Sequence, residues 1–283
     1  MVRLTDAVTI VFDWLNGDIR TLREDYERVR AKPVPPDASW LHVGTDPDVV
    51  KVLRFPAEGE ANTAIVYFHG GGFIVGSPLT HVDIAMELAK HSNLPLYSVD
   101  YRLAPDHPAP APAEDGISVI RHLVGEGFGH ILLCGDSAGG AIALSVEATL
   151  PEDLRKHIIG VASFYGAHGL LDTDSLIEKG SRGDGTDRAC VARYFVAAGR
   201  DAYSVEALAR PSPVPVYLVA TDDDPLRDDT LILAEAMKDH GRDVTLDVVA
   251  NENHGFLHHQ PYYACAEAAL DRFASWVDAL NRK

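Results

Sequence analysis

Short apolar runs alternate with longer amphipathic segments along most of this chain. The runs are rich in β-branched residues, which favour strands, and they lie at 48–54, 64–68, 95–99, 130–134, 158–164, 214–220 and 244–250. Between them, apolar residues recur at helical spacing at 80–92, 112–124, 138–149, 226–239 and 262–281. Buried strands that alternate with helices predict a mostly parallel central sheet with helices on both faces.

The chain opens with a separate helical stretch. Up to about Arg30, apolar residues recur at helical spacing among acids and arginines, at Val8, Val11, Phe12, Leu15, Ile19 and Leu22. The run KPVPPD at 32–37 interrupts this pattern, because consecutive prolines lack amide donors and disfavour helix before them. We therefore expect an N-terminal helical arm at 1–36 and one large α/β domain at 37–283.

One long segment breaks the alternation of strands and helices. Residues 167–210 stand where a short link would suffice, and insertions of this length usually serve a functional site or are disordered. The part at 172–187 is polar and glycine-rich. The apolar part, with Val191, Tyr194, Phe195 and Val196, predicts a helix that packs on the rest of the protein.

Composition agrees with a packed globular protein and narrows its partners. The chain has 283 residues, 46% of them hydrophobic and 24% charged, and a formal net charge of −17. This negative field repels nucleic acid and anionic membranes, and no apolar stretch approaches the roughly 20 residues that cross a bilayer. The opening residues do not resemble a signal peptide and the three cysteines are widely spaced, so we expect a cytoplasmic protein. The sequence leaves the oligomeric state open, a homodimer included.

The first chemical signal is the segment GDSAGG at 135–140. It follows the strand candidate HILLC and opens a helix rich in small residues. A nucleophile elbow places its serine at such a strand-to-helix turn, where glycines on either side avoid collisions with neighbouring elements. The segment therefore predicts that Ser137 is a nucleophile; a glycine turn with an N-capping serine is the alternative.

A glycine run after an earlier strand candidate suggests where an oxyanion binds. His69-Gly70-Gly71-Gly72-Phe73 follows AIVYF, and glycines allow a substrate carbonyl to approach backbone N–H groups closely. We expect Gly71 and Gly72, together with Ala138 after the nucleophile, to form an oxyanion hole. We expect His69 to brace the loop rather than transfer protons, and a merely flexible loop is the other interpretation.

The partners of the serine are expected after the last two strand candidates. TDDDPLRDD follows VPVYLVA, and its five aspartates compete for the role of acid: Asp222, Asp223, Asp224, Asp228 and Asp229. His254, in Asn-His-Gly-Phe after the last strand candidate, is the expected base. The neighbouring His258 and His259 have no Cys or His at ligand spacing, so the sequence predicts no metal and no cofactor.

These motifs together resemble the hormone-sensitive-lipase-like family of α/β-hydrolase esterases over nearly all of 64–260. The resemblance rests on HGGGF at 69–73 with Gly76, DYRLAP at 100–105, HPAPAPAED at 107–115, GDSAGG at 135–140, DPLRD at 224–228 and HGF at 254–256. It implies an α/β-hydrolase fold and selects Asp224, directly before Pro-Leu, as the acid. It also implies that the N-terminal arm and the insertion at about 167–210 form a small helical cap.

The expected function is hydrolysis of a small-molecule ester. Ser137, Asp224 and His254 would form a catalytic triad that works through an acyl-enzyme, in the chain order of α/β-hydrolases. The polar, short cap leads us to expect a preference for short acyl chains. An amide or formamide hydrolase similar to arylformamidases, with the same triad, is the first alternative. A ligand receptor without catalysis is the second.

Overall fold

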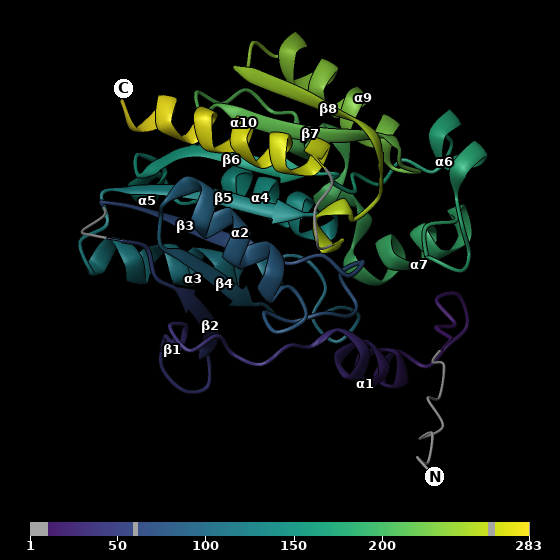
Figure 1. Cartoon of the computed structure of the whole chain (residues 1–283), viewed down its shortest axis with the longest axis horizontal. Helices are drawn as coiled ribbons and strands as arrows, with labels where there is room; N and C mark the ends of the chain where they lie inside the picture. The colour runs from purple at the N-terminus through teal and green to yellow at the C-terminus, as the bar shows by residue number, and fades with distance from the viewer. Residues whose placement is uncertain (1–10, 59–61, 260–263, 283) are drawn as a thin grey trace.

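The computed structural model describes residues 11–58, 62–259 and 264–282. Within them, eight strands form one sheet of order β1-β2-β4-β3-β5-β6-β7-β8 (Figure 1). The strands are β1 (Ser39–Val43), β2 (Val50–Phe55), β3 (Thr63–Phe68), β4 (Leu96–Asp100), β5 (His130–Asp136), β6 (Ile158–Phe164), β7 (Val216–Asp223) and β8 (Val244–Asn253). The predicted mostly parallel sheet is confirmed, since every pairing from β4 through β8 is parallel.

The two strands at one edge run antiparallel and include one that the sequence pattern missed. β1 pairs with β2, and β2 pairs with β4, both in antiparallel register. β1 has the sequence SWLHV, and only Val43 in it is buried. An exposed edge strand of five residues lacks the continuous apolar run that identified the other strands.

Helices cover both faces of the sheet, as predicted (Figure 1). α2 (Val82–Ser92) and α10 (Ala264–Asn281) pack together on one face, while α3 (Ala111–Gly125), α4 (Ala138–Thr149) and α9 (Arg227–Asp239) lie on the other. Alternate residues of β3 contribute to the two hydrophobic cores, Val66 to one and Ile65 to the other. Because both faces of its strands are covered, the sheet is a rigid support for the loops at its edge.

The N-terminal helix is shorter than the apolar spacing predicted. α1 spans Ile19–Arg30, and the side chain of Asp18 caps it by accepting a hydrogen bond from Thr21 N. A turn closed by Gly17 N donating to Asp13 O precedes it, so Phe12 and Leu15 are not helical. The expectation of a helix through these residues was wrong, because a turn residue and an N-cap outweigh apolar spacing. Val8 lies outside the described residues.

The long insertion folds into short helices. These are α6 (Asp174–Lys179), α7 (Arg188–Ala198), the 3₁₀ turn η1 (Arg200–Tyr203) and α8 (Val205–Leu208); elsewhere α5 (Glu152–Arg155) and the 3₁₀ turn η2 (Phe256–His258) are also short. The predicted packed helix corresponds to α7, with Val191 and Phe195 buried. Val196, however, is 82% exposed, so it does not belong to the packed face.

Residues 11–17 and α7 meet near the carboxyl ends of the parallel strands (Figure 1). Arg193 on α7 donates hydrogen bonds to Trp14 O at 2.8 Å and to Gly17 O at 2.6 Å. Arg23 on α1 donates to Ile74 O at 2.8 Å and to Ala104 O at 2.7 Å. These bonds connect the two segments to each other and to the loops after β3 and β4.

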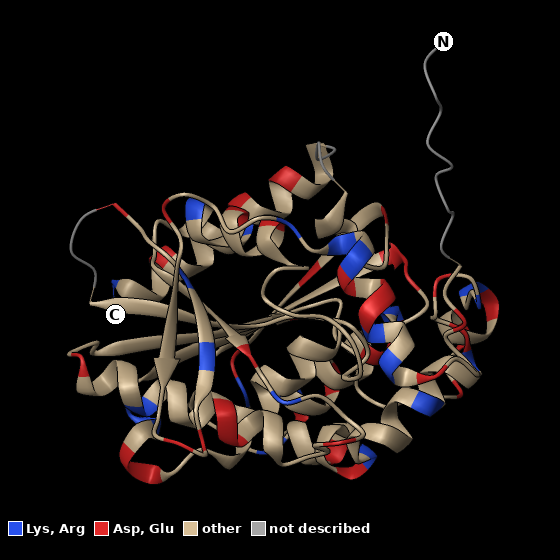
Figure 2. Cartoon of the chain, turned by 90° about the horizontal axis from the view of Figure 1, so that it is seen from below, with Lys and Arg blue, Asp and Glu red and all other residues tan. Residues whose placement is uncertain are grey.

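The charged residues lie mostly on the helices and loops around the sheet, where both signs mix (Figure 2). None of the helices in 11–58, 62–259 or 264–282 combines the length and the apolar character that crossing a membrane requires.

Candidate active site

Ser137 stands at a sharp turn between β5 and α4. Its φ of 52° lies in the left-handed region, which is strained for a residue with a side chain. The flanking glycines permit the turn, since a β-carbon on Gly135 would lie 2.2 Å from Gly139 O and one on Gly139 2.0 Å from Phe68 O. The backbone thus places the Ser137 hydroxyl at the carboxyl end of β5, on the wall of a pocket.

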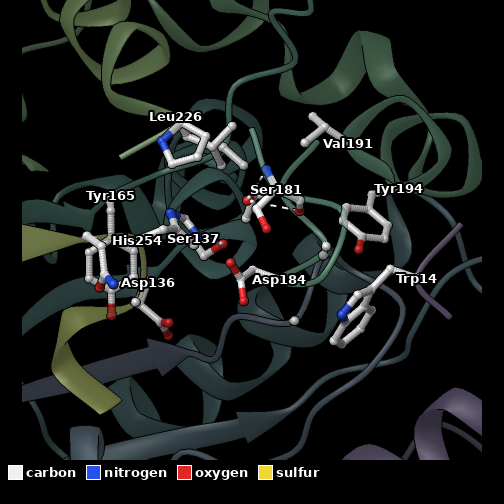
Figure 3. Close-up of a pocket in the computed structure, with 18 of the residues that line it drawn as sticks. Trp14, Asp136, Ser137, Tyr165, Ser181, Asp184, Val191, Tyr194, Leu226 and His254 are labelled. Carbon is white, nitrogen blue, oxygen red and sulfur yellow. Dashed lines mark hydrogen bonds between the residues drawn. The ribbon is translucent and has the colours of Figure 1, made fainter. Parts of the chain in front are cut away.

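Three residues from three strand ends form a chain of hydrogen bonds. Ser137 Oγ lies 3.0 Å from His254 Nε2, and His254 Nδ1 lies 3.0 Å from Asp224 Oδ2. Asp224 follows β7 directly and His254 follows β8, so adjacent parallel strands deliver both side chains to the same edge. Figure 3 shows His254 beside Ser137 at one side of the pocket. The geometry allows the imidazole to accept the serine proton while the carboxylate fixes its tautomer.

The Asp224 carboxylate is held firmly behind the imidazole. It is fully buried, and its Oδ1 accepts a hydrogen bond from Leu226 N at 2.7 Å. Thr221 Oγ1 donates to Oδ2 at 3.3 Å. These bonds satisfy the buried oxygens and orient both toward His254, as a buried charge requires.

The other four aspartates of the acidic run point elsewhere. Asp223 has a side chain 71% exposed and pairs with Lys179. The remaining three accept backbone hydrogen bonds: Asp222 from Asn251 N, Asp228 from Ser175 N and Asp229 from His168 N. Of the five candidates, Asp224 alone is in hydrogen-bond contact with His254.

The surroundings of His254 favour its protonated form. Burial on its own would lower the pKa of this imidazole, but the nearby negative charges, Asp224 first among them, outweigh burial and raise the pKa above its ordinary value. A base with a raised pKa holds the proton it takes from serine more firmly.

Backbone donors without acceptors lie beside the serine. Gly71 and Gly72 line the pocket with φ of 117° and 58°, conformations that glycine adopts without strain. Ala138 is the first residue of α4, where N–H groups lack partners within the helix. No group in the described part of the chain accepts a hydrogen bond from the N–H of Gly71, Gly72 or Ala138. These donors are therefore available to an anionic oxygen. His69 is buried with Nδ1 2.7 Å from Gly70 O, and its ring stacks on Tyr101.

Asp136, for which the sequence alone suggested no role, holds the glycine loop in place. Its Oδ1 accepts hydrogen bonds from Tyr67 OH at 2.5 Å and from Gly70 N at 2.9 Å. Burial raises the pKa of the Asp136 carboxyl to about 6, against the opposing effect of these bonds. An acidic residue at the end of an otherwise apolar strand was the signal that could have identified it.

The pocket in front of Ser137 has a volume of about 710 Å³. Tyr194 and Trp14 stand across it from the serine, and Val191 and Leu226 lie along one side (Figure 3). A β-carbon on Gly72 would lie 2.9 Å from the Tyr194 ring, so this ring rests directly on the glycine loop. His81, Asp136 and His258 also line the pocket and place ligand-type atoms within 4.8 Å of one another.

Several known proteins are similar to this chain in sequence. A family model described as alpha/beta hydrolase fold matches residues 65–258. Acetyl esterase of Salmonella paratyphi B is 28% identical over 304 residues, covering 95% of this chain and 93% of that protein. Esterase LipI of Mycobacterium tuberculosis is 28% identical, covering 96% of this chain and 91% of that protein.

Solved structures of similar shape carry related names. An esterase of Pyrobaculum calidifontis superposes with a TM-score of 0.82 at 25% identity, over 94% of each chain. A thermostable carboxylesterase cloned from a metagenomic library superposes with a TM-score of 0.81 at 25% identity, over 93% of this chain and 98% of that one.

Proposed function

The chain belongs to the alpha/beta hydrolase fold family, and from that premise we propose that it is a serine carboxylesterase with Ser137, His254 and Asp224 as its triad. The observation that carries the proposal is the bond chain Ser137 Oγ–His254 Nε2–Asp224, at 3.0 Å per step, beside the N–H groups of the glycine loop and Ala138. The esterase names of the relatives over most of their length support it.

The reaction proceeds in two halves. His254 Nε2 takes the proton of Ser137 as Oγ attacks the ester carbonyl, and Asp224 stabilises the imidazolium. The N–H groups of Gly71, Gly72 and Ala138 bind the oxyanion, and each such donor is typically worth ~3 kcal/mol. His254 then protonates the departing alcohol. Water, deprotonated by the same imidazole, attacks the acyl-enzyme and releases the acid.

The segments above the pocket act as its cap. The bonds from Arg193 to Trp14 O and Gly17 O join the N-terminal arm to the insertion at about 167–210. Glu178, Ser181 and Asp184 from that insertion line the pocket. We assign the arm and the insertion together to the substrate-binding cap.

The cap favours short acyl chains, about two to six carbons. Each further methylene gains ~0.8 kcal/mol only where an apolar wall receives it, and part of the cap lining is polar. The Tyr194 ring on Gly72 closes the pocket beside the oxyanion site. The names of the acetyl esterase relatives agree with small acyl groups.

We also assign the protein to the cytoplasm. Cys134, Cys190 and Cys265 are free thiols, which suits a reducing compartment. Cell fractionation followed by an esterase activity stain tests this, and activity confined to a secreted or envelope fraction contradicts it.

The experiment that tests the function is a substrate panel. The purified protein should hydrolyse p-nitrophenyl acetate and butyrate, and a fluorophosphonate should label Ser137 as detected by peptide mass spectrometry. Ser137→Ala and His254→Ala should each lower kcat by about 10⁴ to 10⁶, and the double variant should lose little more. Faster turnover of N-formylkynurenine than of any ester would favour a formamide hydrolase. Absence of turnover and of labelling would favour a receptor.

A further inference from the structure

Three side chains from distant parts of the chain meet on the pocket wall beside the triad. His81 precedes α2, Asp136 ends β5 and His258 ends η2. His81 Nε2 lies 3.9 Å from Asp136 Oδ2, and the His81 and His258 rings have centroids 4.6 Å apart. Figure 3 shows Asp136 close to Ser137 and His254. The proposed triad mechanism uses neither His81 nor His258.

One ring nitrogen of His81, Nε2, is unprotonated and faces the other two side chains of this cluster. Its Nδ1 lies 2.7 Å from Thr80 Oγ1, whose own hydrogen goes to Ser77 O at 2.9 Å. Nδ1 must therefore carry a proton and donate it, which leaves Nε2 unprotonated. The His81 side chain is 1% exposed, and its Nε2 has no hydrogen-bond partner among the described residues. Histidines that bind metals typically donate a hydrogen bond from the other ring nitrogen, which fixes the tautomer as the Thr80 contact does here.

The Oδ2 atom of Asp136 lies 3.9 Å from His81 Nε2. Asp136 Oδ1 already accepts from Tyr67 and Gly70, whereas no other described residue donates a hydrogen bond to Oδ2. Two acceptors that face each other in a buried place repel unless a proton donor or a cation lies between them. A ring nitrogen of His258 lies within 4.8 Å of ligand-type atoms of both His81 and Asp136, which makes His258 the third side chain of the cluster.

We propose that His81, Asp136 and His258 bind a divalent metal ion of the zinc class, and that its binding inhibits the hydrolase. Two imidazoles and one carboxylate are a common zinc set, in which ligands at ~2.1 Å from the metal lie about 3.4 Å apart. The 3.9 Å between His81 Nε2 and Asp136 Oδ2 is close to that value. The pocket leaves the remaining position open to water.

The inhibition follows from charge, and this part rests on the proposed function. Asp136 directly precedes Ser137 and lines the same pocket as His254, so its carboxylate charge stabilises an imidazolium that forms there. A divalent ion on Asp136 reverses the sign of that field, because its charge exceeds the charge of the carboxylate. The proton transfer from Ser137 to His254 then becomes less favourable.

Binding is measured first, without turnover. Chelator-stripped protein is titrated with Co²⁺, followed by its visible d–d absorption, and with Zn²⁺ by calorimetry. We expect one ion per chain, and His81→Asn and His258→Asn should each weaken binding at least tenfold. The matched control is His259→Asn, because His259 is exposed and lines the same pocket without belonging to the cluster. This variant should bind the metal ion as the unmodified protein does. Circular dichroism verifies that each variant folds.

Measurements of ester hydrolysis then distinguish metal binding from inhibition by the bound metal. Zn²⁺ should inhibit ester hydrolysis by the unmodified protein and by His259→Asn, reversibly by chelator, and should leave His258→Asn unaffected. No one-to-one Co²⁺ signal, or binding undiminished in both His81→Asn and His258→Asn, overturns the metal site. Binding without inhibition of an active enzyme overturns the inhibitory role. Binding by a protein that hydrolyses no ester overturns the proposed function and leaves the metal site standing.

Discussion

Replacing Asp224 by asparagine tests the triad most sharply, because the structure dictates how the new amide must orient. Leu226 N donates to the oxygen at the Oδ1 position at 2.7 Å, so the amide oxygen of the Asp224→Asn variant has to stay there. The NH₂ group then takes the Oδ2 position and faces His254 Nδ1, which lies 3.0 Å from Oδ2 in the unmodified protein. Nδ1 also lies 3.1 Å from the Oδ1 position, but an NH₂ group at Oδ2 repels a proton on Nδ1, so we expect Nδ1 to become the acceptor and the imidazole proton to move to Nε2.

The wrong tautomer removes the base. Nε2–H faces Ser137 Oγ and cannot take its proton, and the imidazolium also loses the buried charge that stabilises it. We expect kcat to fall by about 10⁴, which corresponds to about 5.4 kcal/mol of activation free energy. The variant should fold normally, because asparagine has the same shape and keeps the bond from Leu226.

The assay is steady-state hydrolysis of p-nitrophenyl acetate by Asp224→Asn beside the matched variant Asp223→Asn. The Asp223 side chain is 71% exposed and its ion pair with Lys179 is screened by solvent, so its loss should change kcat by less than about threefold. Asp224 is not the triad acid if Asp224→Asn keeps more than a tenth of the activity, or if Asp223→Asn loses the activity instead.

Three further outcomes are expected. The rate of hydrolysis should fall as the pH drops through the pKa of His254, because only the neutral imidazole can act as the base. Since the pKa of His254 is raised, this fall should begin at a higher pH than for an ordinary histidine. A kcat/KM profile that stays flat as the pH falls through the histidine range contradicts this. Tyr194→Ala removes the ring that rests on the glycine loop and should shift the kcat/KM optimum to longer acyl esters, whereas Val196→Ala, 82% exposed on the same helix, should not. Glu147→Ala leaves the Arg242 guanidinium buried without its carboxylate and should lower the free energy of unfolding in urea by about 3–5 kcal/mol; a loss below about 1 kcal/mol would show that the pair is dispensable.

Local sequence was enough to predict seven of the eight strands and the segments that meet at the candidate active site. Strands such as β3 are buried on both faces, so their apolar runs stand out, and the glycines around Ser137 are required by contacts within one strand, turn and helix. Signals of this kind survive in the sequence because the interacting residues are close along the chain. β1 and the start of α1 show the limit, since an exposed edge strand has no apolar run and a turn with an N-cap overrides helical spacing.

Only the tertiary structure decided which side chains meet. Local chemistry left five aspartates open and the family resemblance selected Asp224; the pairing of β7 with β8 is what brings that carboxylate to His254. The contact of Tyr194 with Gly72 and the cluster of His81 with His258 join elements that are far apart in the sequence. Spacing along a chain fixes distance within one helix or strand, but between elements distance depends on how the sheet is ordered and what packs on its edge.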